Sequence, residues 1–312
     1  MKKLLAPALA LLVVVSATVP ASASTPFAST AAFIASKFVN GQYIEGFTKG
    51  KPDWGFSVEA LLQLRGAGYT DTGLAKAISY NLKSRTNLGT ATSKRGFLYA
   101  PDGAFLVGRA GEALFAERVF GLQSSAVAKS ILTRVKAAVS KTGEIKNAAG
   151  NTFTYSWAAL GLNAMGERAL ARTICAKLLT FARSDNGFGT DLTADTTAST
   201  PDATGIALMA FAATKSVTSK VATIGRLLFV NAVDHNHWES WGDVDVNGTA
   251  YASMGLTAVN QGAYAFQAFL AGRIGSDGGI TTPWSNGAGD TYATVQGYLA
   301  LRGLSYLSLI KG

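Results

Sequence analysis

One pattern recurs six times along the chain and constrains its fold more than any other feature. Each copy consists of a loop rich in Gly, Asp and Asn, then an Asp or Asn, then a stretch rich in Ala and Leu. The copies are marked by Asp53, Asp102, Asn151, Asp202, Asn247 and Asp290, at spacings of 49, 49, 51, 45 and 43 residues. A period in this range is typical of chains built from one repeated supersecondary unit.

Each repeat contains two kinds of helix. The stretches after the marker residues have the apolar period of a helix and few charges on any face, as around Leu160, which indicates burial on all sides. Between them lie amphipathic stretches. In residues 124–141, Val127, Ile131 and Val135 form one stripe, and Lys129 lies away from it. The sequence therefore predicts an all-α fold of six inner and six outer helices, which close into a ring or stack as an open solenoid.

The first 23 residues have the pattern of a secretory signal peptide. Lys2 and Lys3 precede the apolar run 4–15, and the segment ends in Ala21-Ser22-Ala23. The run is too short to span a bilayer. We therefore expect cleavage near Ala23–Ser24, a secreted or extracytoplasmic protein, a single domain over residues 24–312, and no transmembrane segment in the mature chain.

Charge and cysteine content exclude some classes of protein. Without Lys2 and Lys3, 26 of the 28 basic residues remain against 19 acidic ones, and many basic residues lie on the predicted outer helices. No run of five or six like charges occurs, so a nucleic-acid partner is not expected. Cys175 is the single cysteine, so the chain has no internal disulfide, and the ordinary interpretation of this residue is a small buried hydrophobe.

The connections from outer to inner helices are longer than a helical hairpin needs, and all six must lie at one end of the fold, which we call the mouth. Long loops of this kind are often functional. They carry 14 of the 19 carboxylates, and the five tryptophans lie in them or in the first turns of inner helices. An acidic, aromatic mouth suits sugars, amphiphiles or cationic groups.

The sequence accordingly predicts an exported protein that binds a small apolar, aromatic-compatible or sugar-like ligand at its mouth. The candidate ligand-binding residues are Trp54, Tyr155, Trp157, Asp202, Trp238, Trp241, Trp284 and Tyr292. A second interpretation stays open, in which Asp53, Asp202, Asn247 and Asp290 mainly cap helices. Under the ligand-binding interpretation, the expected partner is a small molecule or a glycan. A partner at the cell surface is a further expectation.

The turns Ser-Asp-Gly-Gly and Asp-Asn-Gly-Phe, together with an Asp-x-x-Thr-Ala-type helix start, resemble the terpenoid cyclase and protein prenyltransferase superfamily of α/α toroids. The resemblance covers nearly all of residues 25–312 and implies that six helix pairs close into an α6/α6 toroid. Members include squalene cyclases, prenyltransferase β subunits, the complement thioester domain and cobalamin carriers. One such fold serves unrelated functions, so the resemblance is specific for architecture only.

The residues that the enzymes of this superfamily need are missing or displaced. In Asp243–Ala250 the cyclase motif Asp-x-Asp-Asp-Thr-Ala is broken, because Val246 or Asn247 replaces an acid, depending on the alignment. The prenyltransferase zinc ligands Asp, Cys and His have no counterpart, since His235 and His237 lack a third ligand and Cys175 lies on an outer helix. The resemblance therefore favours a carrier-like toroid without a cofactor, although cobalamin itself would need a further domain.

Four other functions stay open. Asp243, Asp245 and Asn247 match the start of a calcium loop, but its closing acid falls on Met254. Asp243, Asp245, Asp290 and Glu239 are weak candidates for the paired carboxylates of a glycan hydrolase. The third alternative is a diverged enzyme of the cyclase or prenyltransferase type. The fourth is a structural or protein-interaction module.

Overall fold

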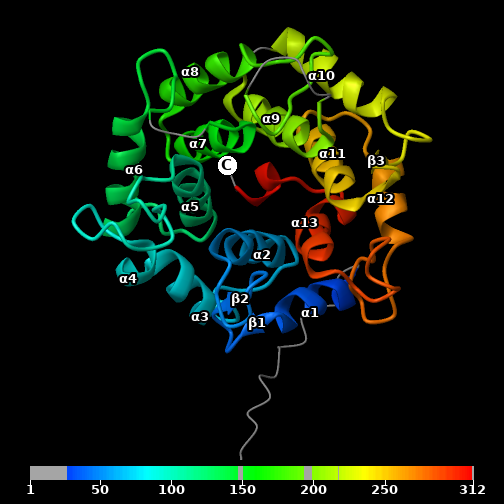
Figure 1. Ribbon diagram of the computed structural model, residues 1–312, viewed down its shortest axis with the longest axis horizontal. Helices are drawn as coiled ribbons and strands as arrows, with labels where there is room; N and C mark the ends of the chain where they lie inside the picture. Colours follow the sequence, from blue (N-terminus) through cyan, green and yellow to red (C-terminus); the bar gives the residue numbers. More distant parts are fainter. Residues whose placement is uncertain (1–26, 147–149, 193–198, 217, 311–312) are drawn as a thin grey trace, which may run out of the picture.

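The computed structural model describes residues 27–146, 150–192, 199–216 and 218–310. The predicted signal peptide and its cleavage site lie outside these residues. Figure 1 shows the described helices as two concentric rings. The inner ring consists of α2 (Trp54–Gly66), α5 (Val107–Val119), α7 (Thr152–Ala164), α9 (Pro201–Thr214), α11 (Val246–Ala258) and α13 (Thr291–Leu301).

The outer ring alternates with the inner one along the chain. It consists of α1 (Ala28–Ser36), the run α3 (Ala75–Ile78), η1 (Ser79–Lys83) and α4 (Arg85–Leu88), then α6 (Ala126–Ala138), α8 (Arg168–Leu179), α10 (Thr218–Val230) and α12 (Tyr264–Ala271). The last inner helix, α13, packs against α1 and α2, so the ring is closed. The prediction of an all-α, α6/α6 toroid is confirmed.

Two details of the predicted repeat are wrong. The sequence predicts one outer helix in each repeat, but the second outer segment is interrupted, because η1 is a π-helical turn and Ser84 has extended backbone and caps α4 through the N–H of Asn87. The second inner helix, α5, begins at Val107 and not beside Asp102, whose carboxylate accepts a hydrogen bond from the N–H of Ala104 in the preceding turn at 2.9 Å.

Two short antiparallel hairpins lie in the mouth loops. Strand β1 (Phe38–Val39) pairs with β2 (Tyr43–Ile44), and β3 (Trp238–Ser240) pairs with β4 (Asp243–Asp245) with Trp238 opposite Asp245. A hydroxyl in the first turns of four inner helices receives a hydrogen bond from the main chain of the preceding loop. The N–H groups of Ile44, Phe188, Trp238 and Ile280 donate, at 2.8–3.0 Å, to the hydroxyls of Ser57, Thr204, Thr249 and Thr294. These contacts fix the mouth loops to the inner ring.

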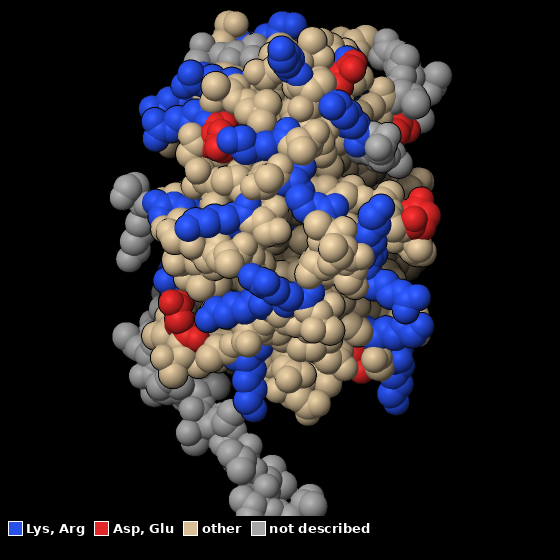
Figure 2. Space-filling view, turned by 90° about the vertical axis from the view of Figure 1, so that its left-hand side faces the viewer, with Lys and Arg blue, Asp and Glu red and all other residues tan. Residues whose placement is uncertain are grey.

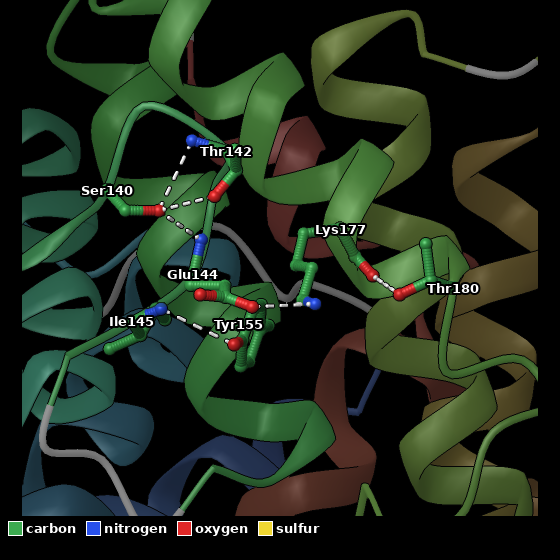
Figure 3. Close-up of polar contacts among 7 residues, drawn as sticks. All are labelled: Ser140, Thr142, Glu144, Ile145, Tyr155, Lys177 and Thr180. Atoms are coloured by element: carbon green, nitrogen blue, oxygen red, sulfur yellow. Dashed lines mark hydrogen bonds and ion pairs between the residues drawn. The ribbon is translucent and has the colours of Figure 1, made fainter.

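The loop between α6 and α7 is held by both rings (Figure 3). The N–H of Glu144 donates to the Ser140 hydroxyl at 2.9 Å, and the Glu144 carboxylate pairs with Lys177 of α8 at 2.9 Å. The N–H of Ile145 donates to the Tyr155 hydroxyl of α7 at 3.4 Å. Tyr155, a predicted ligand-binding residue, is only 5% exposed and serves to hold this loop.

Inner helices α5 and α7 approach so closely that side chains are excluded where they cross. A β-carbon added to Gly111 would lie 2.4 Å from the carbonyl oxygen of Trp157, and one added to Gly161 would lie 2.2 Å from the carbonyl oxygen of Gly111. Helices α9 and α11 cross in the same way, because a β-carbon on Gly205 would lie 2.3 Å from the carbonyl oxygen of Tyr251. Glycine is therefore required at these crossings for reasons of space.

Replacing Gly111 with Ala is expected to lower the free energy of unfolding by about 2 kcal/mol or more, because the added methyl group meets main chain that no side-chain rotation can move. Urea unfolding followed by circular dichroism measures this change. A Gly262→Ala control, where nothing lies within 4 Å of the added β-carbon, is expected to stay within about 0.5 kcal/mol of the parent. Equal stability of the two variants would contradict the close crossing.

The end of the chain fills the centre of the inner ring. After α13 the chain turns back, and the 3-10 helix η2 (Tyr306–Leu309) lies inside the ring, near the C-terminus in Figure 1. Tyr306 is fully buried, and its ring centroid lies 5.1 Å from Trp157, 6.2 Å from Phe115 and 6.5 Å from Tyr251. Because inner helices start at the mouth and end at the opposite face, this plug closes the toroid on the side away from the mouth.

Basic side chains predominate on the outer ring. Figure 2 shows the side of the molecule that includes α4 and α6, where Lys and Arg far outnumber Asp and Glu. This distribution agrees with the amphipathic pattern of the predicted outer helices. Within the described ranges, no helix is both long enough and apolar enough to cross a membrane.

Candidate functional site

Four inner helices begin at a capping carboxylate or amide. Asp53, Asn151, Asp245 and Asp290 cap α2, α7, α11 and α13, and each side chain accepts a hydrogen bond from the N–H three residues further on, at 2.7–3.1 Å. Such contacts satisfy main-chain donors that a helix start leaves free. The capping interpretation is therefore confirmed for Asp53 and Asp290.

The capping interpretation is wrong for Asp202 and Asn247. Helix α9 begins with Pro201, which suits the first helical position because it has no N–H, and this places Asp202 inside the first turn. Asp245 takes the capping position of α11, so Asn247 lies within the helix and its amide donates to the side-chain oxygen of Gln296 on α13. Both side chains are half-buried at the mouth.

A pocket of about 600 Å³ lies at the mouth between the starts of α9 and α11, the β3–β4 hairpin and the loop before α13. It brings together four of the predicted ligand-binding residues from two separate loops and one helix start. These are Asp202, Trp238, Trp241 and Trp284, and the weak catalytic candidates Glu239, Asp243 and Asp245 also line the pocket. Asp290 does not line it.

Trp241 occupies an unusual position at the tip of the β3–β4 hairpin. The two turn residues, Trp241 and Gly242, have φ of 56° and 86°, as in a type I′ turn, where Asn-Gly is the favoured pair. A bulky side chain in this left-handed region is strained. Trp241 is nevertheless fully exposed at 102%, and Trp284 on the neighbouring loop is 75% exposed.

The acidic residues of this pocket differ in exposure and in the hydrogen bonds that their carboxylates already make. The Asp245 carboxylate caps α11 through one oxygen and accepts a hydrogen bond from the Ser240 hydroxyl on the other at 2.8 Å. Glu239 is exposed and lies 3.6 Å from the His237 imidazole, and Asp243 is half-buried. In the parts of the chain that the structure describes, no three His, Cys, Asp or Glu side chains converge as metal ligands.

Two other predicted ligand-binding residues pack elsewhere. Trp54 is 2% exposed, and its indole N–H donates to the carbonyl oxygen of Asn81 in the outer ring at 3.0 Å. The ring of Tyr292 stacks between those of Phe47 and Phe56, with centroid distances of 5.1 and 4.1 Å. Neither residue lines the mouth pocket, because side chains in the first turn of an inner helix can also point toward neighbouring helices and loops.

The interior of the toroid holds a buried carboxylate that the sequence analysis missed. Glu59 of α2 is 6% exposed, and one of its oxygens accepts hydrogen bonds from the hydroxyls of Tyr251 at 2.7 Å and Tyr306 at 2.6 Å. The other oxygen accepts from the Gln296 amide at 3.2 Å. Burial raises the pKa of Glu59, and these three hydrogen bonds oppose that rise by stabilising the ionised form.

A second buried acid, Glu112 of α5, has a different environment. It is 7% exposed and makes no hydrogen bond to any described residue. Burial above all, and then the nearby carboxylates Glu59 and Asp53, raise the pKa of Glu112 well above its usual range, while Arg109 opposes the rise. Burial thus raises the pKa of both acids, and only Glu59 has hydrogen bonds that oppose the rise.

Glu112 and Trp157 line a second cavity, of about 320 Å³, at the starts of α5 and α7. Trp157, another predicted ligand-binding residue, is 7% exposed. A signal for the two interior acids is present in the sequence, because Glu-Ala-Leu occurs at residues 59–61 and again at 112–114, each time within an inner helix. An isolated acid in an apolar helix is seldom buried without a partner.

Comparisons with known proteins identify the architecture. No family model and no curated protein sequence matches the chain. Among solved structures, a Candida albicans protein geranylgeranyltransferase-I complexed with GGPP aligns with a TM-score of 0.61 and 13% identity, over 91% of this chain and 90% of that one. An unsaturated glucuronyl hydrolase from Bacillus sp. GL1, responsible for the degradation of glycosaminoglycan, aligns with a TM-score of 0.59 and 12% identity, over 91% and 95%. At this identity the likeness establishes the α/α-toroid fold alone.

Proposed function

We propose that this chain is an exported α/α toroid that captures a saccharide in its mouth pocket. The observation that carries the proposal is Trp241, a fully exposed indole on a strained hairpin turn at the edge of a 600 Å³ pocket. Strain and exposed apolar surface together are typical of ligand-binding positions rather than of structural ones. With Trp238 and Trp284 it offers flat aromatic faces against which a sugar ring packs.

The remaining walls of the pocket favour a polyhydroxylated ligand over a purely apolar one. Asp202 and Asp243 contribute carboxylates, and Thr190, Ser199 and Thr282 lie beside them. An apolar ligand would remove these groups from water without offering them hydrogen bonds, which costs free energy. Sugar hydroxyls donate to carboxylates and exchange hydrogen bonds with Ser and Thr.

We propose capture of the saccharide rather than its hydrolysis. Glycoside hydrolysis needs two carboxyl groups, one that donates a proton and one that acts as base or nucleophile. Both oxygens of Asp245 are already occupied, by the start of α11 and by Ser240, and Asp290 caps α13 away from the pocket. Asp202, Asp243 and the exposed Glu239 remain in the pocket, and we assign all three to hydrogen bonds with the sugar.

Changing Trp284 to Ala is expected to weaken saccharide binding by about tenfold or more, because one stacking face is lost from the pocket. The measurement is calorimetric titration with soluble hexasaccharides of glucose, xylose and N-acetylglucosamine, supported by tryptophan fluorescence. A Tyr264→Ala control removes an aromatic ring that is 80% exposed on outer helix α12 and is expected to leave affinity unchanged. If none of the sugars binds, or if both variants bind like the parent, the proposal fails.

Changing Trp241 to Asn is expected to separate binding from stability. Asn relieves the left-handed strain at the first turn position, so the free energy of unfolding should rise by about 1 kcal/mol and the melting temperature by about 2–4 °C. Saccharide affinity should fall at the same time, because the exposed indole is gone. Thermal unfolding and the same titrations measure both effects; a Trp284→Asn variant serves as a control that relieves no such strain.

A further inference from the structure

The cavity at the starts of α5 and α7 is separate from the mouth pocket. It encloses about 320 Å³ and shares no lining residue with that pocket. Its walls combine aromatic rings with a carboxyl group, since Phe105, Phe153 and Trp157 line it together with Glu112. This volume lies at the lower end of the range for small-molecule sites, about 300–1,000 Å³.

Glu112 is directed into this cavity without a protein partner. It is 7% exposed, lines the cavity, and makes no hydrogen bond to any residue in the described ranges. Glu59, buried to a similar degree, has three donors. Buried polar groups are normally satisfied, and one left open toward a cavity points to a group that a ligand supplies.

The charges that face Glu112 are mostly negative. Glu59 and Asp53 from α2 and its start both disfavour ionisation of Glu112, and Arg109 of α5 alone favours it. The Arg109 guanidinium is held at the surface, where it donates to the carbonyl oxygen of Phe97 at 3.2 Å. Arg109 also lines the cavity, whereas Glu59 and Asp53 do not. A cation in the cavity is therefore attracted to the ionised carboxyl group of Glu112 and, at longer range, to these two acids.

Gly55 leaves open the space where two of these acids converge. The position that a β-carbon on Gly55 would occupy lies 3.8 Å from an oxygen of Glu112 and 3.9 Å from an oxygen of Asp53. A positively charged group placed there would contact both carboxyl groups. Phe153 and Trp157, which line the cavity, supply aromatic rings of the kind that attract ammonium groups.

We propose that this cavity binds a small organic ammonium ion, with Glu112 as its counter-ion and Phe153 and Trp157 as its aromatic walls. The proposal does not depend on saccharide capture at the mouth. Burial raises the pKa of Glu112, so at pH values below that pKa binding proceeds by exchange: the cation enters, Glu112 becomes a carboxylate, and one proton leaves to solvent. Below the pKa of Glu112, affinity therefore increases about tenfold for each unit by which the pH is raised.

The test is calorimetric titration of the whole protein with benzylammonium chloride, repeated in buffers of different ionisation enthalpy to count released protons. We expect release of about one proton per ligand and an affinity that increases with pH. Benzyl alcohol, which has the same shape without the charge, should bind at least about tenfold more weakly. Equal binding of the alcohol, or binding without proton release, would overturn the proposal.

Two matched variants locate the site. Glu112→Gln preserves shape and removes the charge, and it should lower benzylammonium affinity by about tenfold or more and abolish proton release. Glu117→Gln changes another buried acid of α5 that does not line the cavity, and it should leave both unchanged. Parent-like binding by Glu112→Gln would refute the assignment. If that variant does not fold, the proton count on the unmodified protein still decides.

Discussion

Replacing Tyr306 with Ala is expected to lower the free energy of unfolding by about 3–5 kcal/mol, because it leaves a cavity at the centre of the inner ring. Tyr306 is fully buried, its ring lies 5.1 Å from that of Trp157, and its hydroxyl donates to Glu59 at 2.6 Å. Urea unfolding followed by far-ultraviolet circular dichroism measures the loss. A stability within about 1 kcal/mol of the parent would mean that the plug does not occupy the ring in solution.

The Tyr306→Phe variant separates the two contributions. It keeps the aromatic packing and removes one of the three hydrogen bonds to the Glu59 carboxylate. A hydrogen bond to a charged group contributes about 1.5–3 kcal/mol, so this variant should lose less stability than Tyr306→Ala. If the two variants lose equal stability, the hydroxyl of Tyr306, and not the packing of its aromatic ring, accounts for the stability that this residue contributes.

The plug also restricts where ligands can enter. It lies inside the ring and contacts α2, α9 and α11 from the side on which the inner helices end. Both cavities described above instead lie at helix starts, which places them at the mouth. Closure at one end and openings at the other are consistent with ligand capture from the solvent side of the mouth loops.

The repeat was predictable because its signals are local. The recurrent Asp or Asn and the alternation of apolar and amphipathic stretches define the helix pairs before any tertiary contact is known. The prediction that the helix pairs close into a ring came from the resemblance to α/α toroids. The C-terminal plug was not predicted, since residues 302–310 have no counterpart in the other repeats and the position of η2 depends on the space inside the finished ring.

The candidate site was predictable only in part. Trp238, Trp241 and Trp284 lie around one pocket because their loops share the mouth. The same argument failed for Trp54, which faces the outer ring, because the direction of a side chain in a first helical turn depends on how neighbouring helices cross. Glu112 was overlooked since a single acid in an apolar stretch carries no motif by itself.

Changing Glu117 to Gln is expected to stabilise the protein by several kcal/mol near pH 8 and hardly at all near pH 4.5. Glu117 of α5 is 1% exposed, and neither carboxyl oxygen has a hydrogen-bond partner among the described residues. Burial raises the pKa of Glu117 from 4.5 to about 8, although Lys83 opposes the rise. Urea unfolding of parent and variant at both pH values measures the difference.

The sign follows from which state binds the proton. Between about pH 4.5 and 8 the folded protein keeps the Glu117 proton and the unfolded chain releases it, so the parent loses stability as the pH rises through this interval. The full interval corresponds to roughly 4 kcal/mol. Gln resembles the protonated acid at every pH and avoids this loss.

A Glu144→Gln control, which alters an exposed ion pair with Lys177, should change stability by less than about 1 kcal/mol at either pH. A Glu117→Gln effect that is the same at both pH values would show that Glu117 is solvated or paired in the folded protein.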